Sequence, residues 1–180
     1  MSTRTGRSAG FRIRPLGESD YALIPGLETE ADRLYATVPE LAGYLFEANA
    51  SPDILKSAYP PGSGLIAEIE GEVVAFAVFR PVDDALYLGQ ISVHPACQQR
   101  GIGRALLRGV LDHARGAGFP AVSLLTFAAV PFNGPWYRRA GFVPFPVSAQ
   151  GEGFKKLATS EIEIAIGALS PREALIRYLD

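Results

Sequence analysis

The chain has 180 residues, of which 48% are hydrophobic and 20% are charged, a composition typical of a single globular domain. It has 17 lysines and arginines against 19 aspartates and glutamates, and the net charge of -2 disfavours a nucleic-acid-binding protein. One cysteine, Cys97, and two histidines give neither a disulfide framework nor metal-ligand spacing. No apolar run approaches the roughly 18 residues of a membrane span. These features predict a cytoplasmic protein without a metal, in which residues 1–10 form a disordered tail and residues 11–180 one domain.

The first half of the chain predicts a strand, two helices, a loop and an antiparallel meander. The strands show apolar and polar residues in alternation, and the helices show apolar residues at helical spacing. Prolines and a glycine indicate the loop, and turn residues separate the strands of the meander. The strands are expected at 11–15, 64–70, 73–80 and 85–94, the helices at 18–35 and 39–48, the loop at 50–63, and the turns at 71–72 and 81–84.

The second half changes its pattern after Pro95. Three further helices and three further strands are expected, in the order helix, strand, helix, strand, helix, strand. Their ranges are 101–116, 121–127, 133–140, 142–147, 152–167 and 172–179. The strand, helix and strand from 85 to 127 predict one parallel crossover. The predicted fold class is therefore α+β, with a mixed, mostly antiparallel sheet flanked by helices.

The segment between the strand that ends at His94 and the helix that follows carries the strongest chemical signal. Backbone N–H groups in the first turn of a helix have no partner within the helix, and the helix dipole places positive charge there. Gly101 and Gly103 would let a pyrophosphate approach this backbone, and Arg100 and Arg104 would add charge. A simpler reading is that the two glycines only relieve crowding at the start of the helix. The dinucleotide-binding fingerprint fits poorly, because its third glycine would fall at Leu106.

These residues resemble a known family. The pattern Gln98-x-x-Gly101-x-Gly103 is similar to the Q/R-x-x-G-x-G/A signature of the GCN5-related N-acetyltransferase (GNAT) superfamily, and Val93-His94-Pro95 precedes it as in that family. Residues 133–142, Asn-Gly-Pro-Trp-Tyr-Arg-Arg-Ala-Gly-Phe, look like the later Asn…Tyr…Gly-Phe block. The resemblance covers about residues 11–147. It implies a GNAT fold, with a sheet of six to seven strands and one parallel βαβ crossover that forms the acyl-CoA site.

The resemblance also implies where the co-substrate acetyl-CoA binds. It would lie in a V-shaped opening between the fourth and fifth strands. Backbone groups of the fourth strand would bind the pantetheine arm, the backbone of Gln98–Arg104 would bind the pyrophosphate, and Tyr137 would lie near the sulfur. The implied cofactor-binding residues are Ile91, Ser92, Val93, Gln98, Gln99, Arg100, Gly101, Ile102, Gly103, Arg104, Asn133 and Tyr137.

Acetyl transfer to an amine implies two catalytic groups among these residues. The carbonyl oxygen gains negative charge in the transition state, and the backbone N–H of Val93 is the expected donor to it. A thiol has a reference pKa of about 8.5 and a tyrosine hydroxyl one of about 10, so Tyr137 could protonate the leaving sulfur. The alternative for Tyr137 is an aromatic that packs beside Trp136 and Phe142.

The general base is missing from its usual place. Many relatives carry a glutamate in the fourth strand, but residues 86–92 contain no acid, and Gly89 or Gln90 occupies the position. His94 is disfavoured as a base because it is expected to point away from the reacting carbonyl. A water chain to a carboxylate elsewhere is one solution, and an amine of low pKa would need no base. The carboxylates considered are those of Glu28, Glu30, Asp32 and Glu68.

The acceptor is expected near 29–44 and 144–154, where aromatic residues accompany carboxylates. Such a pocket would suit a cationic amine; the alternative is an amphipathic helix face with solvated charges. The residues are Tyr35, Tyr44, Phe145, Phe154, Glu28, Glu30, Asp32 and Glu40. The function expected is an N-acetyltransferase for a primary amine of a small molecule or peptide. The alternatives are a longer acyl group and a non-catalytic acyl-CoA sensor, and a homodimer, common in the family, stays open.

Overall fold

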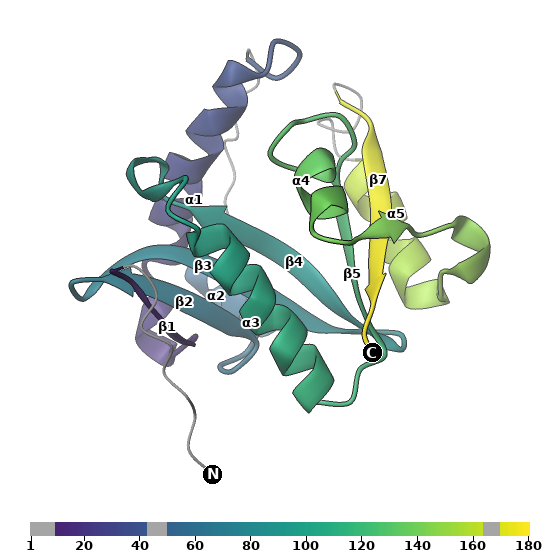
Figure 1. Ribbon diagram of the computed structural model, residues 1–180, viewed down its shortest axis with the longest axis horizontal. Coiled ribbons are helices and arrows are strands. Elements are labelled where there is room, and N and C mark those ends of the chain that lie inside the picture. Colours follow the sequence, from purple (N-terminus) through teal and green to yellow (C-terminus); the bar gives the residue numbers. More distant parts are fainter. Residues whose placement is uncertain (1–9, 43–49, 164–169) are drawn as a thin grey trace. The chain divides into compact units, whose positions relative to one another are not determined.

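The computed structural model describes residues 10–42, 50–163 and 170–180, and Figure 1 shows the order of its elements. Within these residues seven strands form one sheet in the order β1-β2-β3-β4-β5-β7-β6. Strands β4 and β5 pair in parallel, and the other printed pairs are antiparallel. The strands are β1 Arg12–Pro15, β2 Gly64–Ile69, β3 Glu72–Val82, β4 Ala85–Val93, β5 Ala121–Phe127, β6 Val143–Pro144 and β7 Arg172–Tyr178. The predicted α+β class and the parallel crossover are confirmed.

Five α-helices and four short 3-10 helices lie in the described residues. The α-helices are α1 Ile24–Asp32, α2 Pro52–Ala58, α3 Ile102–Gly116, α4 Gly134–Arg139 and α5 Glu152–Glu163. The 3-10 helices are η1 Glu18–Asp20, η2 Arg33–Thr37, η3 Pro95–Cys97 and η4 Val147–Ala149. Helix α3 and strand β5 therefore begin and end within a residue of their predicted bounds.

The predicted loop at 50–63 is wrong, because it contains α2. Ser51 caps this helix by accepting a hydrogen bond from the Ile54 N–H at 3.4 Å. Pro52 follows at the first helical position, where its missing N–H costs nothing and its fixed φ suits the helix. A proline suits a loop as well as the first position of a helix, and here the Ser51 cap makes it the start of a helix.

Other predicted bounds also need correction. The helix expected at 18–35 is divided into η1, α1 and η2. Residues 39–42 form turns, while 43–48 of the second predicted helix lie outside the described residues, as do 1–9 of the predicted tail and 164–167 of the last helix. The strand at 142–147 shortens to β6, and β3 continues to Val82 before its turn.

The first hairpin turn is one residue earlier than predicted. Its two residues are Glu70 and Gly71, with φ of 52° and 89°. Positive φ at both central residues matches the right-handed twist of antiparallel strands and favours glycine. Because a glutamate occupies the first of these positions, the sequence does not indicate that the turn begins there.

The fold separates into two compact units. The described residues of the first unit are 10–34, 50–79 and 90–110, and those of the second are 35–42, 80–89, 111–163 and 170–180.

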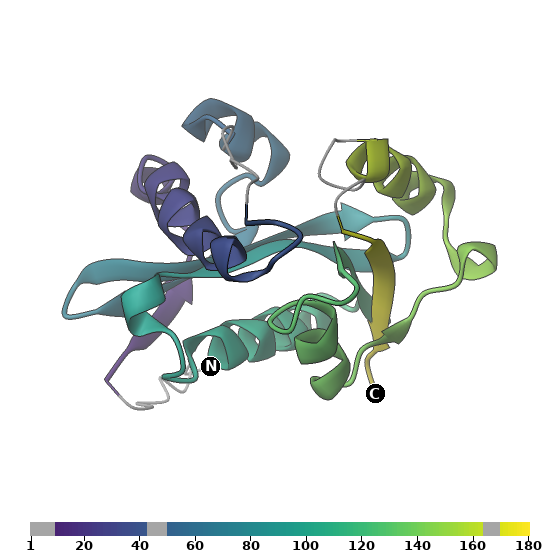
Figure 2. The same cartoon turned by 90° about the horizontal axis from the view of Figure 1, so that it is seen from above.

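In the first unit, helices cover both faces of the β2–β3 hairpin. Ile66 packs with the buried residues of α1 and α2, including Ile24 and Leu55. Its neighbour Leu65 points to the opposite face, toward α3, because successive strand side chains alternate. A Cβ added to Gly109 of α3 would lie 2.6 Å from Leu65 Cδ1, so this glycine allows the close approach. Figure 2 shows α1 and α2 on one side of these strands and α3 on the other.

In the second unit, β7 lies between β5 and β6 and completes the sheet. Leu124 of β5 faces Leu175 of β7 in register, and Val143 of β6 faces Ile176. Helix α5 packs on this part of the sheet through Phe154. Every residue of β5 is buried, as expected for a strand that is covered on both faces.

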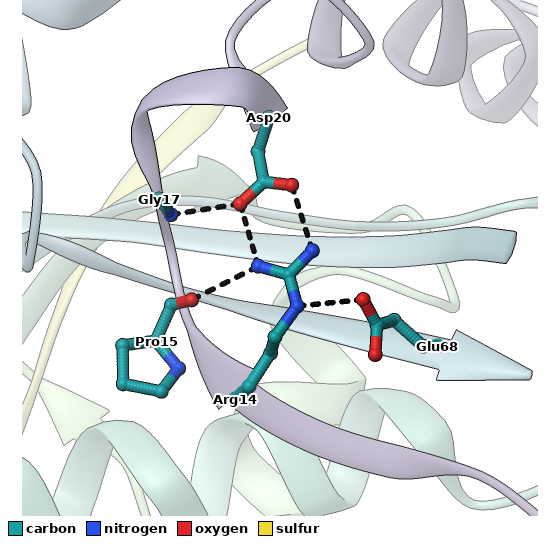
Figure 3. Close-up of polar contacts among 5 residues, drawn as sticks. All are labelled: Arg14, Pro15, Gly17, Asp20 and Glu68. Carbon is teal, nitrogen blue, oxygen red and sulfur yellow. Dashed lines mark hydrogen bonds and ion pairs between the residues drawn. The ribbon is translucent and has the colours of Figure 1, made fainter. Parts of the chain in front are cut away.

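An arginine joins β1, η1 and β2 within the first unit (Figure 3). Arg14 donates from Nε to Glu68 Oε1 at 2.6 Å, from Nη1 to Asp20 Oδ2 at 2.6 Å, and from Nη2 to Asp20 Oδ1 at 2.7 Å. Asp20 also accepts from the Gly17 N–H at 2.7 Å. The Asp20 side chain is only 3% exposed, and its hydrogen bonds to Arg14 hold the pKa of this carboxyl below its usual value.

Replacing Arg14 with methionine is expected to lower the free energy of unfolding by about 2 to 3 kcal/mol, because Asp20 would be left buried without a cation. Since the folded pKa of Asp20 is depressed, its contribution is present above the unfolded pKa of about 3.9 and is lost as the pH falls through the folded pKa. The loss should therefore shrink below about pH 4. Urea denaturation at pH 7 and pH 3 measures both effects. Arg12→Met, on the same strand and exposed, is the control, and an equal loss there would contradict the assignment.

Candidate functional site

The segment from β4 to α3 lies in the first unit and makes a turn of unusual backbone conformation. After η3, Gln98 is extended, whereas Gln99 and Gly101 have φ of 60° and 80°. A Cβ added to Gly101 would meet nothing within 4 Å. Crowding therefore does not explain this glycine, and its left-handed backbone does.

This backbone leaves a group of N–H donors unpaired at the start of α3. The first helical hydrogen bond runs from the Ala105 N–H to the Gly101 carbonyl oxygen at 3.0 Å. Among the described residues, no acceptor is found for the N–H groups from Gln99 to Arg104. Together with the positive end of the α3 dipole, these donors suit an anion.

The side chains around this turn are consistent with an anion site. Gln98 Nε2 donates to the Val93 carbonyl oxygen at 3.4 Å and links the turn to the end of β4. Arg100 and Arg104 are exposed, and neither forms an ion pair with a described acid. Their positive charges are thus available to a ligand.

The end of β4 presents the backbone of Val93 away from β3. The next N–H, that of His94, donates to the Val74 carbonyl oxygen on β3 at 2.8 Å. Because consecutive N–H groups of a strand point to opposite sides, the Val93 N–H points the other way. The Val93 N–H is therefore directed away from β3, where it could donate to a ligand. His94 itself caps η3 by accepting from the Ala96 N–H at 3.2 Å, a structural role.

A polar group in the first unit connects α1 with β4. Gln90 Nε2 donates to Glu28 Oε1 at 2.8 Å and to Ser92 Oγ at 3.0 Å. Burial raises the pKa of Glu28, and the hydrogen bond from Gln90 partly opposes the rise. Burial also raises the pKa of Asp32, one turn later, to about 7, with a further contribution from the Glu28 charge.

The structure distinguishes the four carboxylates considered as bases. Glu68 is bound by Arg14, and Glu30 pairs with Arg33 at 2.8 Å. Glu28 and Asp32 form no ion pair among the described residues. Of the four, Glu28 is the one that contacts β4. This contact joins residues 62 positions apart, and no feature of the sequence identifies it.

The second unit holds Asn133 and Tyr137. Asn133 Nδ2 donates to Tyr35 Oη at 3.2 Å and to Thr126 Oγ1 at 3.1 Å, and thereby ties the start of α4 to β5. Tyr137 is 9% exposed and packs edge-on against Trp136 and Phe142, the contacts that the alternative reading expected. Burial raises the pKa of Tyr137 well above the usual value for tyrosine.

The predicted site residues divide between the two units. The β4 end and the turn 98–104 belong to the first, and Asn133 and Tyr137 belong to the second. The V-shaped opening between the fourth and fifth strands therefore stays a prediction.

The described aromatic residues of the expected acceptor pocket lie in the second unit. Phe154 is 1% exposed and packs against Tyr87 and Phe145, which favours a core role over a pocket wall. Tyr35 packs against Phe127 and Phe132. Glu40 is exposed, and Tyr44 lies outside the described residues.

Two other features are absent from the described part of the chain. No group of three or more histidine, cysteine, aspartate or glutamate residues there could hold a metal ion. No helix among those residues is long and apolar enough to cross a membrane.

Comparisons with known proteins agree on one family. The profile described as "Acetyltransferase (GNAT) family" matches residues 29–142. The mycothiol acetyltransferase of Sanguibacter keddieii is 31% identical over 161 residues, which cover 83% of this chain and 51% of that protein. The chain spans 29% of the length of a second curated relative, so it corresponds to about half or less of these proteins.

Solved structures share the fold. The N-acetylglutamate synthase of Neisseria gonorrhoeae, in complex with coenzyme A and N-acetyl-glutamate, has a TM-score of 0.72 at 23% identity, over 97% of this chain and 36% of the synthase. A GNAT family acetyltransferase of Brucella melitensis, in complex with acetyl-CoA, has a TM-score of 0.56 at 30% identity, over 76% of this chain and 84% of its own.

Proposed function

The chain belongs to the acetyltransferase (GNAT) family, and we propose that it is an N-acetyltransferase that transfers an acetyl group from acetyl-CoA to a primary amine of a small molecule or peptide. The observation that carries the proposal is the set of unpaired N–H donors from Gln99 to Arg104 at the start of α3. The complexes of the Brucella and Neisseria proteins with acetyl-CoA and coenzyme A support the choice of co-substrate.

The turn before α3 would bind the pyrophosphate of acetyl-CoA. Its N–H groups and the helix dipole supply positive charge without a cost of reorganisation, since the backbone already holds its conformation. Arg100 and Arg104 would add charge-assisted hydrogen bonds at the rim. The β4 backbone at Ile91, Ser92 and Val93 would bind the pantetheine arm.

In the proposed reaction, the amine attacks the acetyl carbonyl directly in a ternary complex. The Val93 N–H would donate to the carbonyl oxygen, which gains negative charge as the carbon–nitrogen bond forms. The N–H points away from β3, as this role requires.

Tyr137 would donate a hydrogen bond to the leaving sulfur. Because burial raises its pKa above the usual value of about 10, Tyr137 stays protonated throughout the neutral pH range. The same shift makes full transfer of its proton to a thiolate, with a pKa of about 8.5, unfavourable. Its main contribution is therefore stabilisation of the developing thiolate. Asn133 would support this part of the protein by holding the start of α4.

One observation favours a second candidate, a non-catalytic sensor of acyl-CoA. The fourth strand has Gly89 or Gln90 where many relatives carry a glutamate, and β4 contains no acid, so the usual proton acceptor is absent from that strand. A sensor would keep the anion-binding turn and would not need this acid.

Binding and turnover together test the proposal. Calorimetric titration with acetyl-CoA, butyryl-CoA and CoA is expected to show micromolar binding, and thiol release should follow with one class of amine from a panel. Binding without thiol release from any amine would favour the sensor. Thiol release only with butyryl-CoA would replace acetyl by a longer acyl group, and an absence of binding would contradict the proposal.

A further inference from the structure

We infer that Glu28 of α1 accepts the proton of the acceptor amine and that Gln90 of β4 is the residue that positions it. This inference rests on the proposed function and names the proton acceptor that the fourth strand lacks. The amide lies on the strand and the carboxylate on the helix.

The side chains of Gln90 and Glu28 are in direct contact. Gln90 lies three residues before Val93, the proposed donor to the acetyl carbonyl oxygen. Its amide nitrogen is bonded on one side to Ser92 and on the other to Glu28, at 3.0 Å and 2.8 Å. The amide is thereby fixed in orientation, and it holds one carboxylate oxygen of Glu28 beside the strand that would bind the acetyl group.

The other oxygen of the carboxylate is not used in this contact. Glu28 Oε2 is buried and has no hydrogen-bond partner among the described residues. A buried carboxylate oxygen without a donor is costly, and the cost is relieved when a donor reaches it. An ammonium group is such a donor, either directly or through one water molecule, which is the reach that general-base catalysis requires.

The proton balance of the step is simple. Glu28 takes one proton from the acceptor ammonium, which makes the nitrogen nucleophilic. The carbon–nitrogen bond forms, the carbon–sulfur bond breaks, and the electron pair goes to the sulfur. The remaining extra proton on nitrogen leaves with the sulfur as CoA thiol, and Glu28 returns its proton to solvent.

The groups around Glu28 set its pH dependence. Gln90 faces it from β4 and does not titrate, and Asp32 follows one turn later on α1 with a pKa of about 7. Burial raises the pKa of Glu28 and Gln90 lowers it, with burial the larger influence. The acid limb of kcat/KM should therefore lie above the ordinary glutamate range.

Glu28→Gln tests the role of the carboxylate, because glutamine can still accept the hydrogen bond from Gln90. The probes are the amine of the panel that the unaltered protein acetylates fastest and its β,β-difluorinated analogue, whose amine pKa is lowered toward neutrality. The variant is expected to lose about 100-fold or more in kcat with the parent amine and less than 10-fold with the analogue, which needs no base. Glu30→Gln, which changes a half-exposed acid of the same helix that pairs with Arg33, is the matched control with no loss.

Gln90→Met tests the positioning role at nearly constant volume. Loss of the hydrogen bond removes the influence that lowers the pKa of Glu28, so the acid limb of kcat/KM should move to higher pH. A purely structural role of Gln90 would lower activity equally at all pH values. The double variant Glu28→Gln with Gln90→Glu restores the pair in reverse and is expected to recover at least 10-fold over Glu28→Gln.

The outcomes separate this inference from the proposed function. Equal losses with both amines, no loss in Glu28→Gln, or the expected pattern in Asp32→Asn instead would overturn the inference while the activity of the unaltered protein stands. If the unaltered protein acetylates no amine, the proposed function and this inference fall together.

Discussion

Replacing Gly103 with aspartate is expected to weaken acetyl-CoA binding by about 100-fold while the folded chain becomes no less stable. A carboxylate in the first turn of α3 would lie among the N–H donors proposed to bind the pyrophosphate. Repulsion between like charges a few ångströms apart at a protein surface amounts to about 3 kcal/mol, which corresponds to about 100-fold in affinity. The same carboxylate interacts favourably with the helix dipole and replaces a poor helix former.

The opposite signs of the two effects make this variant informative. A general loss of structure would lower both the affinity for acetyl-CoA and the melting temperature. A carboxylate among the N–H donors is instead expected to lower the affinity and to leave the melting temperature equal or higher. Gly116→Asp is the matched control, since it adds the same charge at the exposed last residue of α3. It should leave the calorimetric affinity unchanged. An equal loss of affinity in both variants would show that net charge, rather than the anion-binding turn, is responsible.

Tyr137→Phe is expected to lower kcat by about 100-fold and to leave acetyl-CoA affinity unchanged. The hydroxyl would act only on the sulfur that gains charge in the transition state, so its loss removes transition-state stabilisation without ground-state binding. Since burial raises the Tyr137 pKa above its usual value, the unaltered protein should show no loss of activity from ionisation of this group below pH 10. The ring contacts with Trp136 and Phe142 persist in the variant.

Steady-state kinetics and calorimetry on the same preparation measure the two quantities. Tyr178→Phe removes a hydroxyl from a tyrosine that is 63% exposed, and it should change neither. Unchanged kcat in Tyr137→Phe would contradict the role of the hydroxyl and leave Tyr137 as a packing aromatic. A parallel loss of affinity would assign it to cofactor binding instead.

The sequence allowed most of the sheet and the glycine-containing turn before α3 to be predicted because their signals are local. Strand β5 is a continuous apolar run, and α3 combines helical apolar spacing with glycines at its start. The left-handed backbone of Gly101 is one that glycine adopts without strain. Family resemblance supplied the proposed roles of Asn133 and Tyr137, which spacing alone does not.

The features that could not be predicted depend on contacts between distant residues or on residues that suit more than one local structure. The proline that begins α2 reads equally as a loop residue, and only the Ser51 cap decides between the two. The hydrogen bond between Gln90 and Glu28 joins a strand to a helix across 62 positions. The sequence showed that the fourth strand has no acid. The fold showed that the carboxylate of Glu28 lies beside Gln90 of that strand.

The most direct test of the central claim is a backbone amide NMR titration of the isotopically labelled chain with CoA and, separately, with pantetheine, which lacks the pyrophosphate. We expect the largest shifts with CoA at the N–H groups from Gln99 to Arg104, and we expect pantetheine to leave those signals in place. Saturating CoA that leaves these amides unshifted, or equal shifts with pantetheine, would contradict the claim that this turn binds the pyrophosphate of the co-substrate.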